Sequence, residues 1–421
     1  MTERQDQIRF RVIQTCFFLT GALCISIKGG YSYAPAVLLL LSLPIIIKRG
    51  TYSALNRDSK LHLMIIVLYV LVQVISILLD GGGIKDFDRP SRALLGAAVF
   101  ILCLRYPPRF SWLMAGISIG ATGAGIRAVF NRFVSGDGRA FESMNAIQGG
   151  NISMTLGLLS LCGVMWSIKR SRYLHTFFFA IATIMGVVGS ILSKTRGGWI
   201  LVPVILFIIY RIYSDWFSKR LKLGMLLTSS LLIIFCLTPQ STIPKRFKEI
   251  GQDIRLYSAG DKKDTSTGHR LELWKSSLDS FVQKPLFGWG NQGVKASRDQ
   301  QFINGSLSKE TYDFNSHAHN QYLDEMAKRG AIGLTALLAL FLFPLYLFEK
   351  GLKESENPES RTFAACGVVL VLSMMGYCLT QSFLNHNSGI VFYSIFTAYF
   401  ISATSPATTK NGFLNLSSLE K

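Results

Sequence analysis

Long apolar runs alternate with short polar gaps along most of the 421 residues. A helix needs about 20 mostly apolar residues to cross a bilayer, and fewer where neighbouring helices shield it. On this rule the pattern predicts about twelve membrane-spanning helices, and hence an all-α polytopic membrane protein. The expected spans begin near Phe10, Tyr33, Leu61, Ser91, Phe110, Asn151, Leu174, Trp199, Leu223, Ala331, Thr362 and Asn387.

One polar segment, about residues 237–329, is far longer than the other gaps and separates the ninth expected span from the tenth. We therefore expect four parts. Residues 1–238 form nine membrane helices with short loops, and residues 239–330 form a large loop that contains amphipathic helices. Residues 331–404 form the last three membrane helices, and residues 405–421 form a tail.

Within the long loop, apolar residues recur at helical spacing and predict an amphipathic helix that lies along the membrane interface or against the bundle. They are Leu271, Trp274, Leu278, Phe281 and Val282. The helix should end at Lys284 and Pro285, before a turn rich in glycine and aromatic residues. Residues 295–315 lack periodicity, which predicts a mobile lid or a surface loop. A second helix over residues 319–329, stopped by Gly330, should lead into the tenth span.

The composition agrees with a membrane protein, since 49% of the residues are hydrophobic and only 16% are charged. The chain has 44 Lys and Arg against 25 Asp and Glu, a net charge of +19. In a soluble protein this excess would suggest a nucleic-acid partner, but here the cations gather in alternate short gaps, so we expect no nucleic acid. The positive-inside rule places both termini in the cytoplasm and the long loop outside, which in a bacterial inner membrane means the periplasm.

The cysteines and histidines narrow the possible chemistry. All seven cysteines fall in or at the ends of apolar runs, so a disulfide framework or a cysteine-bound zinc is not expected. His317 and His319 lie two residues apart, with no motif for a divalent cation around them. Surface histidines, metal ligands and a catalytic role all remain open from this spacing alone. We expect no metal and no cofactor.

Two polar segments carry residues suited to a phosphate. The outer turn after the seventh span contains Lys194 and Arg196 beside a glycine pair, which suits either an anion site or contacts with lipid headgroups. The long loop contains Arg270, next to His269. An arginine grips phosphate oxygens through two donors, and a histidine removes a proton near neutral pH. Together these residues suit transfer chemistry on a lipid-linked phosphate.

Four short motifs resemble the superfamily of bacterial O-antigen ligases and O-antigen polymerases. They are TRGGW (residues 195–199) at an outer helix end, GHRLELW (268–274), PLFGWG (285–290) and HAHNQYLD (317–324) before a helix. The resemblance covers about residues 151–340. It implies metal-independent transfer of a glycan from an undecaprenyl diphosphate-linked donor to an acceptor, in contact with membrane lipid. For a ligase the acceptor is the lipid A-core oligosaccharide, and for a polymerase it is a second lipid-linked glycan.

The resemblance also assigns roles to residues. Arg196 and Arg270 correspond to the arginines that hold the diphosphate, and His319 corresponds to the general base. The second choices for substrate contacts are Lys194, His317, Trp274, Asn320 and His269. The length, the basic balance and the single dominant late loop favour an O-antigen ligase over a polymerase. A protein-directed oligosaccharyltransferase ranks third, and a lipid or glycan transporter is the alternative outside this class.

Overall fold

A computed structural model describes residues 3–48, 50–53, 55–195, 197–219, 222, 255, 266–314 and 317–404. These residues form helices and no strands, which confirms the predicted all-α class. Eight helical segments of the described chain are long and apolar enough to cross a membrane. They are Gly30–Ile47, Arg57–Leu79, Phe110–Phe133, Ala146–Lys169, Tyr173–Leu192, Gly197–Trp216, Gln321–Glu354 and Pro358–Cys378. The protein is therefore a polytopic membrane protein.

Eleven α-helices of the described residues make up the bundle. They are α1 (Glu3–Leu23), α2 (Gly30–Ile47), α3 (Arg57–Leu79), α4 (Asp88–Arg105), α5 (Phe110–Phe133), α6 (Ala146–Lys169), α7 (Tyr173–Leu192), α8 (Val202–Tyr213), α14 (Gln321–Glu354), α15 (Pro358–Cys378) and α16 (Asn387–Thr404). Short 3₁₀ turns connect them: η1 (Ile84–Phe87), η2 (Glu142–Met144), η3 (Gly197–Trp199), η4 (Ser214–Trp216) and η5 (Phe383–Asn385). These helices match eleven of the twelve expected spans. The span expected near Leu223 lies outside the described residues, so the total of about twelve stays a prediction.

The centre of the bundle is formed by α6 and α15. In each of them 83% of the most apolar stretch is buried, whereas the buried share is 33% in α3 and 28% in α7. In a bilayer the exposed apolar side chains of such outer helices face lipid, because lipid is as apolar as the protein core. Helices α4 and α16 pack against each other, as do α1 and α5, inside the same bundle. Since neighbouring helices shield them, α1, α4 and α16 need less apolar surface to occupy a membrane.

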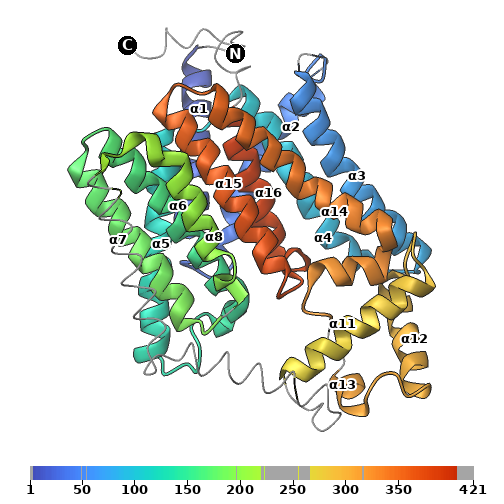
Figure 1. Cartoon of the computed structure of the whole chain (residues 1–421). Helices are drawn as coiled ribbons and strands as arrows, with labels where there is room; N and C mark the ends of the chain where they lie inside the picture. Colours follow the sequence, from blue (N-terminus) through green and yellow to red (C-terminus); the bar gives the residue numbers. More distant parts are fainter. Residues whose placement is uncertain are drawn as a thin grey trace.

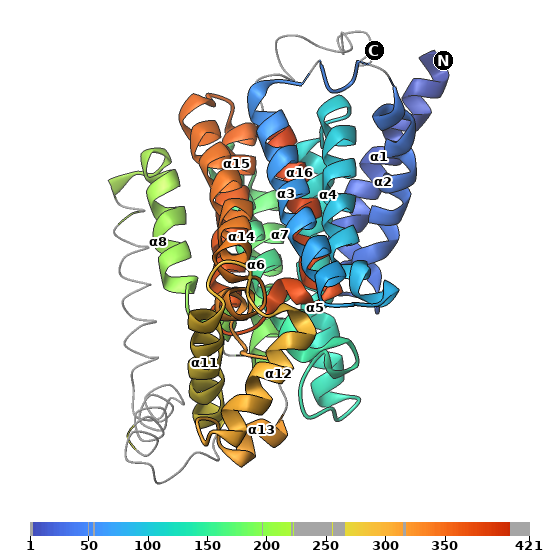
Figure 2. The ribbon, with the colours of Figure 1, turned by 90° about the vertical axis from the view of Figure 1, so that its right-hand side faces the viewer.

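The start of α1 and the end of α16 lie at the same end of the bundle (Figure 1). Three further helices lie at the opposite end: α11 (Ser266–Gln283), α12 (Gly290–Ile303) and α13 (Lys309–Phe314). Figure 2 shows this group projecting beyond the bundle, next to the lower end of α14. We call these three helices the outer unit. That the outer unit faces the periplasm stays a prediction.

The outer unit confirms one sequence prediction and corrects another. Helix α11 is the predicted amphipathic helix, and it ends at Gln283, just before Lys284 and Pro285. Within this interval the structure describes residues 295–314, and these are not a loop, since α12 and α13 cover most of them. The prediction was wrong because α12 buries Val294, Ser297 and Gln301. These residues have helical spacing, but two of them are polar, so no apolar period is visible in the sequence.

Gly330 joins the outer unit to the membrane bundle. It has φ 61° and ψ −155° and kinks α14 where the predicted second helix was expected to stop. A Cβ atom at this position would lie 2.4 Å from the carbonyl carbon of Leu286, in the turn after α11. Only glycine allows both this backbone angle and this close approach. The kink therefore fixes the angle at which the outer unit meets the span that follows.

Candidate active site

The histidine pair lies on the turn that leads into α14. The Asn320 side chain caps this helix by accepting hydrogen bonds from the backbone N–H groups of Tyr322 (3.0 Å) and Leu323 (3.2 Å). The preceding residue, His319, has φ 47°, in the left-handed region that residues with side chains rarely occupy. Its backbone N–H donates to Nδ1 of His317 at 3.0 Å. Strained backbone of this kind often accompanies functional residues.

The hydrogen bonds define the protonation of both rings. Nδ1 of His319 lies 2.7 Å from Oε1 of Gln381, and an amide oxygen only accepts, so this nitrogen carries the hydrogen. In the neutral ring Nε2 is then the nitrogen that accepts a proton. His317 has the opposite form, because its Nδ1 accepts from a backbone N–H. Nε2 of Gln381 contacts Nε2 of His386 at 3.3 Å, which extends the chain of hydrogen bonds to a third histidine.

The surroundings keep the His319 ring neutral near pH 7. Burial lowers its pKa, and Arg270 lowers it further, while Gln381 and Asp324 act in the opposite direction. Burial, with His319 as the next largest cause, lowers the pKa of His317 to about 4. Burial is the largest cause of both pKa shifts.

Helix α11 brings Arg270 and Trp274 to the histidine turn. Nε1 of Trp274 donates to the carbonyl oxygen of Ala318 at 2.8 Å, so the helix is bonded to the residue before His319. Arg270 lies one helical turn earlier, and residues four apart share a helix face. This explains its electrostatic effect on His319. A cationic group and a neutral imidazole thus lie beside each other between α11 and α14.

The remaining predicted residues have other surroundings. Nδ1 of His269 lies 2.9 Å from Oγ1 of Thr311, which ties it to α13. Lys194 is exposed on the turn between α7 and η3, and it also has a positive φ, 55°. Arg196 lies outside the described residues. The structure therefore brings His317, His319, Asn320, Trp274 and Arg270 together.

The turn that contains the TRGGW motif packs close to the histidine cluster. Oγ1 of Thr195 donates to the carbonyl oxygen of Ala146 at 3.0 Å, at the start of α6. A Cβ atom on Gly197 would lie 2.0 Å from Oγ1 of Thr380, the neighbour of Gln381. The glycine therefore allows this turn to approach the segment that holds His319. Two motifs more than a hundred residues apart in the sequence meet around this segment.

Sequence reasoning missed Gln381 and His386. Both lie in the short polar stretch 380–387 between the last two spans. The available signal was this cluster of amide and imidazole side chains at an outer helix end. Burial lowers the pKa of His386 and Arg89 adds to the effect.

Arg298 on α12 was also missed. Burial lowers the pKa of Arg298, and the carboxylate of Asp324 opposes that shift. Asp324 also acts on the pKa of His317, so Arg298 lies near the histidine pair.

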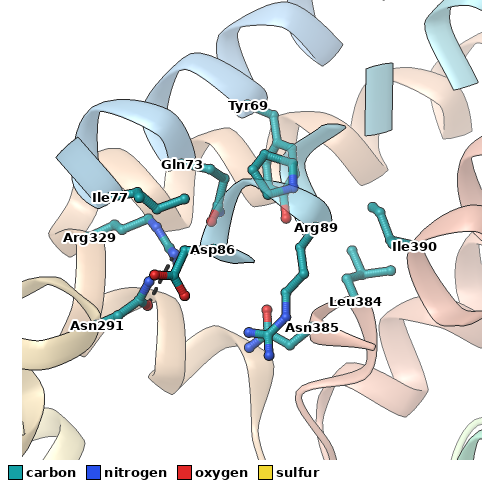
Figure 3. A pocket seen from close by; sticks show the side chains of 11 residues that line it. Tyr69, Gln73, Ile77, Asp86, Arg89, Asn291, Arg329, Leu384, Asn385 and Ile390 are labelled. Carbon is teal, nitrogen blue, oxygen red and sulfur yellow. Dashed lines mark hydrogen bonds between the residues drawn. The ribbon is translucent and has the colours of Figure 1, made fainter. Parts of the chain in front are cut away.

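A polar pocket lies between α3, the start of α4, α14 and η5 (Figure 3). Its lining residues are Tyr69, Gln73, Ile77, Asp86, Arg89, Pro90, Asn291, Arg329, Leu384, Asn385 and Ile390. The pocket volume of about 20 Å³ is enough for a water molecule, which needs roughly 10–15 Å³, but not for a sugar ring. Arg329 forms a buried salt bridge of 2.8 Å with Glu325 there, and Gln73 of α3 donates to the same carboxylate. This network stabilises the base of the histidine turn and does not form a substrate cavity.

No group of three His, Cys, Asp or Glu side chains within the described part of the chain is arranged to hold a metal ion. The expected metal independence nevertheless stays a prediction. Six of the cysteines, all except Cys236, lie in the described residues, and all six are buried and free.

Comparisons with known proteins agree with the motif resemblance. A family model described as O-antigen ligase matches residues 181–338, which include all four motifs. The chain is 30% identical over 392 residues to an uncharacterized protein of Haemophilus influenzae, covering 93% of this chain and 97% of that protein. It is 22% identical over 232 residues to the O-antigen ligase of Escherichia coli, covering 54% of this chain and 53% of the relative.

A third relative is the general O-oligosaccharyltransferase of Acinetobacter baylyi, which is 28% identical over 192 residues. That match covers 44% of this chain and 32% of the relative. The two relatives with named activities are thus matched over about half and about a third of their lengths. The chain belongs to the O-antigen ligase superfamily, whose function is of the membrane glycan ligase or polymerase type.

Proposed function

We propose that this protein is an O-antigen ligase of the bacterial inner membrane. It transfers O-antigen polysaccharide from undecaprenyl diphosphate to a sugar hydroxyl of lipid A-core, at the periplasmic face. One observation carries the proposal: a neutral histidine, His319, is held through Nδ1 by Gln381 while Arg270 lies beside it. A ring in this state accepts a proton at Nε2, and a nearby guanidinium attracts a phosphate.

The proposed reaction is a single displacement at the anomeric carbon. The acceptor hydroxyl oxygen attacks this carbon while its proton moves to Nε2 of His319. The bond between the anomeric carbon and the diphosphate oxygen breaks, and the electron pair leaves with the lipid diphosphate. The configuration of the anomeric centre is therefore inverted. General-base assistance of this kind contributes about 10²–10⁴ in rate.

Charge stabilisation is the second requirement, because negative charge develops on the leaving diphosphate. Arg270 is suited to this role by its position on the same face of α11 as Trp274. We assign Arg196 the same role from its motif, since the TRGGW turn packs against Thr380 beside Gln381. Lys194 is a further candidate for the diphosphate, and His317 and Asn320 are expected to orient the base. The reaction needs no metal and no cofactor in this proposal.

Purified protein tests the assignment of the base. His319→Ala should lose at least a hundredfold in transfer while it still binds the lipid-linked donor, because the diphosphate contacts remain. The matched control is His175→Ala, an exposed histidine at the start of α7. Chelators should leave the wild type active. A wild-type rate for His319→Ala, or activity lost with EDTA and restored by metal, would overturn the general-base mechanism.

A deletion strain separates ligase from polymerase. A missing ligase removes all long chains from lipopolysaccharide and lets lipid-linked polymer accumulate. A missing polymerase leaves lipid A-core that carries a single repeat unit. A transporter, the alternative from another class, would form no new glycosidic bond in a reconstituted mixture of purified donor and acceptor.

A further inference from the structure

Helix α11 buries several small polar residues in its second half. Ser276, Ser277 and Ser280 are all buried, in addition to Leu273 one turn earlier. The hydroxyl of Ser280 lies 2.9 Å from that of Ser297 on α12. The Gln301 amide donates to Ser280 and to the backbone oxygen of Ser276. The contact between the second half of α11 and α12 is thus held by hydrogen bonds between polar side chains.

Four large apolar side chains at the end of α11 and in the turn that follows are exposed. The exposed fraction is 43% for Leu278, 74% for Val282, 60% for Leu286 and 70% for Phe287. The first three are four residues apart, so they continue one face of α11 into the turn that follows. We call these four residues the outer apolar face. Burial of such a side chain is worth about 1.5–3 kcal/mol, so its exposure to water would be unfavourable. An apolar patch of this kind marks an interaction surface.

The outer apolar face is joined to the beginning of a membrane span. The backbone N–H of Ala331 donates to the carbonyl oxygen of Pro285 at 2.8 Å, and that of Ile332 donates to Leu286 at 3.3 Å. Both donors follow the Gly330 kink, where the apolar part of α14 begins. Ile332 is itself 39% exposed, so apolar surface continues from the turn onto the side of this span. Figure 1 shows one end of α11 beside this part of α14.

The charged and aromatic residues next to the face also suit a membrane boundary. Nζ of Lys284 lies 3.9 Å from the centre of the Trp289 ring. Lysine and tryptophan are both typical of the interface between lipid tails and water, because each combines an apolar body with a polar end. This pair flanks Leu286 and Phe287 in the sequence. The pair is therefore of the kind found where a chain crosses from lipid tails to water.

We propose that the outer apolar face is embedded among the acyl chains of the bilayer leaflet next to the outer unit. The face anchors α11 in the membrane and continues the lipid contact of α14. Because α11 also carries Arg270 and the indole bonded to the histidine turn, this anchor holds the candidate site at headgroup depth. That depth suits a substrate whose phosphate is attached to a lipid. The embedding itself does not depend on which reaction the protein catalyses.

Tryptophan quenching in bilayers tests the embedding. The variants Phe287→Trp and Val282→Trp are reconstituted in phosphatidylcholine vesicles with bromine atoms on the upper acyl chain, and wild-type fluorescence is subtracted. The control is Ile303→Trp, which changes an 80% exposed residue at the far end of α12. We expect the brominated lipid to quench the added signal at 287 and 282 at least threefold more than at 303. Acrylamide in the water should quench the signal at 303 more.

Equal bromine quenching at all three positions, or stronger acrylamide quenching at 287 than at 303, would overturn the proposal. In that case the face would contact water or another protein. All three substitutions lie at exposed side chains, so folding should be preserved, and unchanged elution as a single species in detergent checks this. The measurement needs no glycan substrate. A failure of the proposed ligase activity would therefore leave its outcome unaffected.

Discussion

Two substitutions of Gln381 should move the pH dependence of glycan transfer in opposite directions. In Gln381→Glu a carboxylate replaces the amide oxygen that lies 2.7 Å from Nδ1 of His319. The negative charge favours the protonated ring, so the pKa of His319 rises. In Gln381→Met the hydrogen-bond acceptor is lost with little change of shape. Since that hydrogen bond raises the pKa of His319 in the wild type, its loss lowers the pKa.

The size of each effect follows from the geometry. Two unit charges about 4 Å apart attract by roughly 4 kcal/mol at an effective dielectric constant near 20. An opposite charge at such a distance typically shifts a pKa by about 1–3 units. A neutral hydrogen bond is worth about 1 kcal/mol, which corresponds to less than one unit and to roughly a fivefold change in population. Gln381→Met should therefore shift the profile slightly and lower the maximal rate about five- to tenfold, because the ring loses its orientation.

The assay is kcat/KM for transfer between pH 5 and 9, with donor binding measured separately. A base must be neutral, so activity falls as the pH drops through the pKa of His319. For Gln381→Glu the acid limb of the pH profile should move up by at least one pH unit, and activity should recover at high pH. For Gln381→Met the acid limb should move to lower pH. Gln300→Glu, the same change at an exposed position on α12, is the matched control. Shifts in the same direction, or no shift in either variant, would refute a link between Gln381 and the base.

Much of the fold could be predicted from the sequence, because each membrane-spanning helix requires a long apolar run. The helix ends around the site also have local signals. Asn320 caps α14 and Gly330 kinks it where the sequence indicated a stop, and both effects depend on nearby backbone. Helix α12 gave no such signal, because two of its three buried side chains are a serine and a glutamine, which are held by hydrogen bonds.

Only some of the residues in the candidate site could be predicted from the sequence. Motifs identified His319 and Arg270, but nothing local connects either of them to Gln381, which is 62 residues beyond His319. This contact exists because α14 and α15 pack side by side and bring the turn before α16 against the histidine turn. The same reasoning applies to Glu325 and Arg329. Their spacing of four predicts a helical ion pair, but only the packing of α3 makes it a buried one.

Three further predictions test the charges and the topology. Arg270→Ala and Arg270→Lys should both abolish transfer in protein that still folds, because a lysine cannot replace two-donor contacts to phosphate. Near-normal activity of the Lys variant would show that Arg270 does not hold the diphosphate in this way. Reporter fusions at Ser258 and Ser405, both outside the described residues, should report opposite sides of the membrane, and a shared side would overturn the expected helix count. Glu325→Gln should destabilise the protein by about 3–5 kcal/mol, because it leaves the guanidinium of Arg329, only 6% exposed, without its buried counter-charge. Asp215→Asn removes the partner of Arg361 in an ion pair whose carboxylate is 69% exposed, and should change stability by less than about 1 kcal/mol. Thermal unfolding in detergent measures both variants, and equal effects would mean that the Glu325 pair is hydrated in the membrane and does not hold the histidine turn in place.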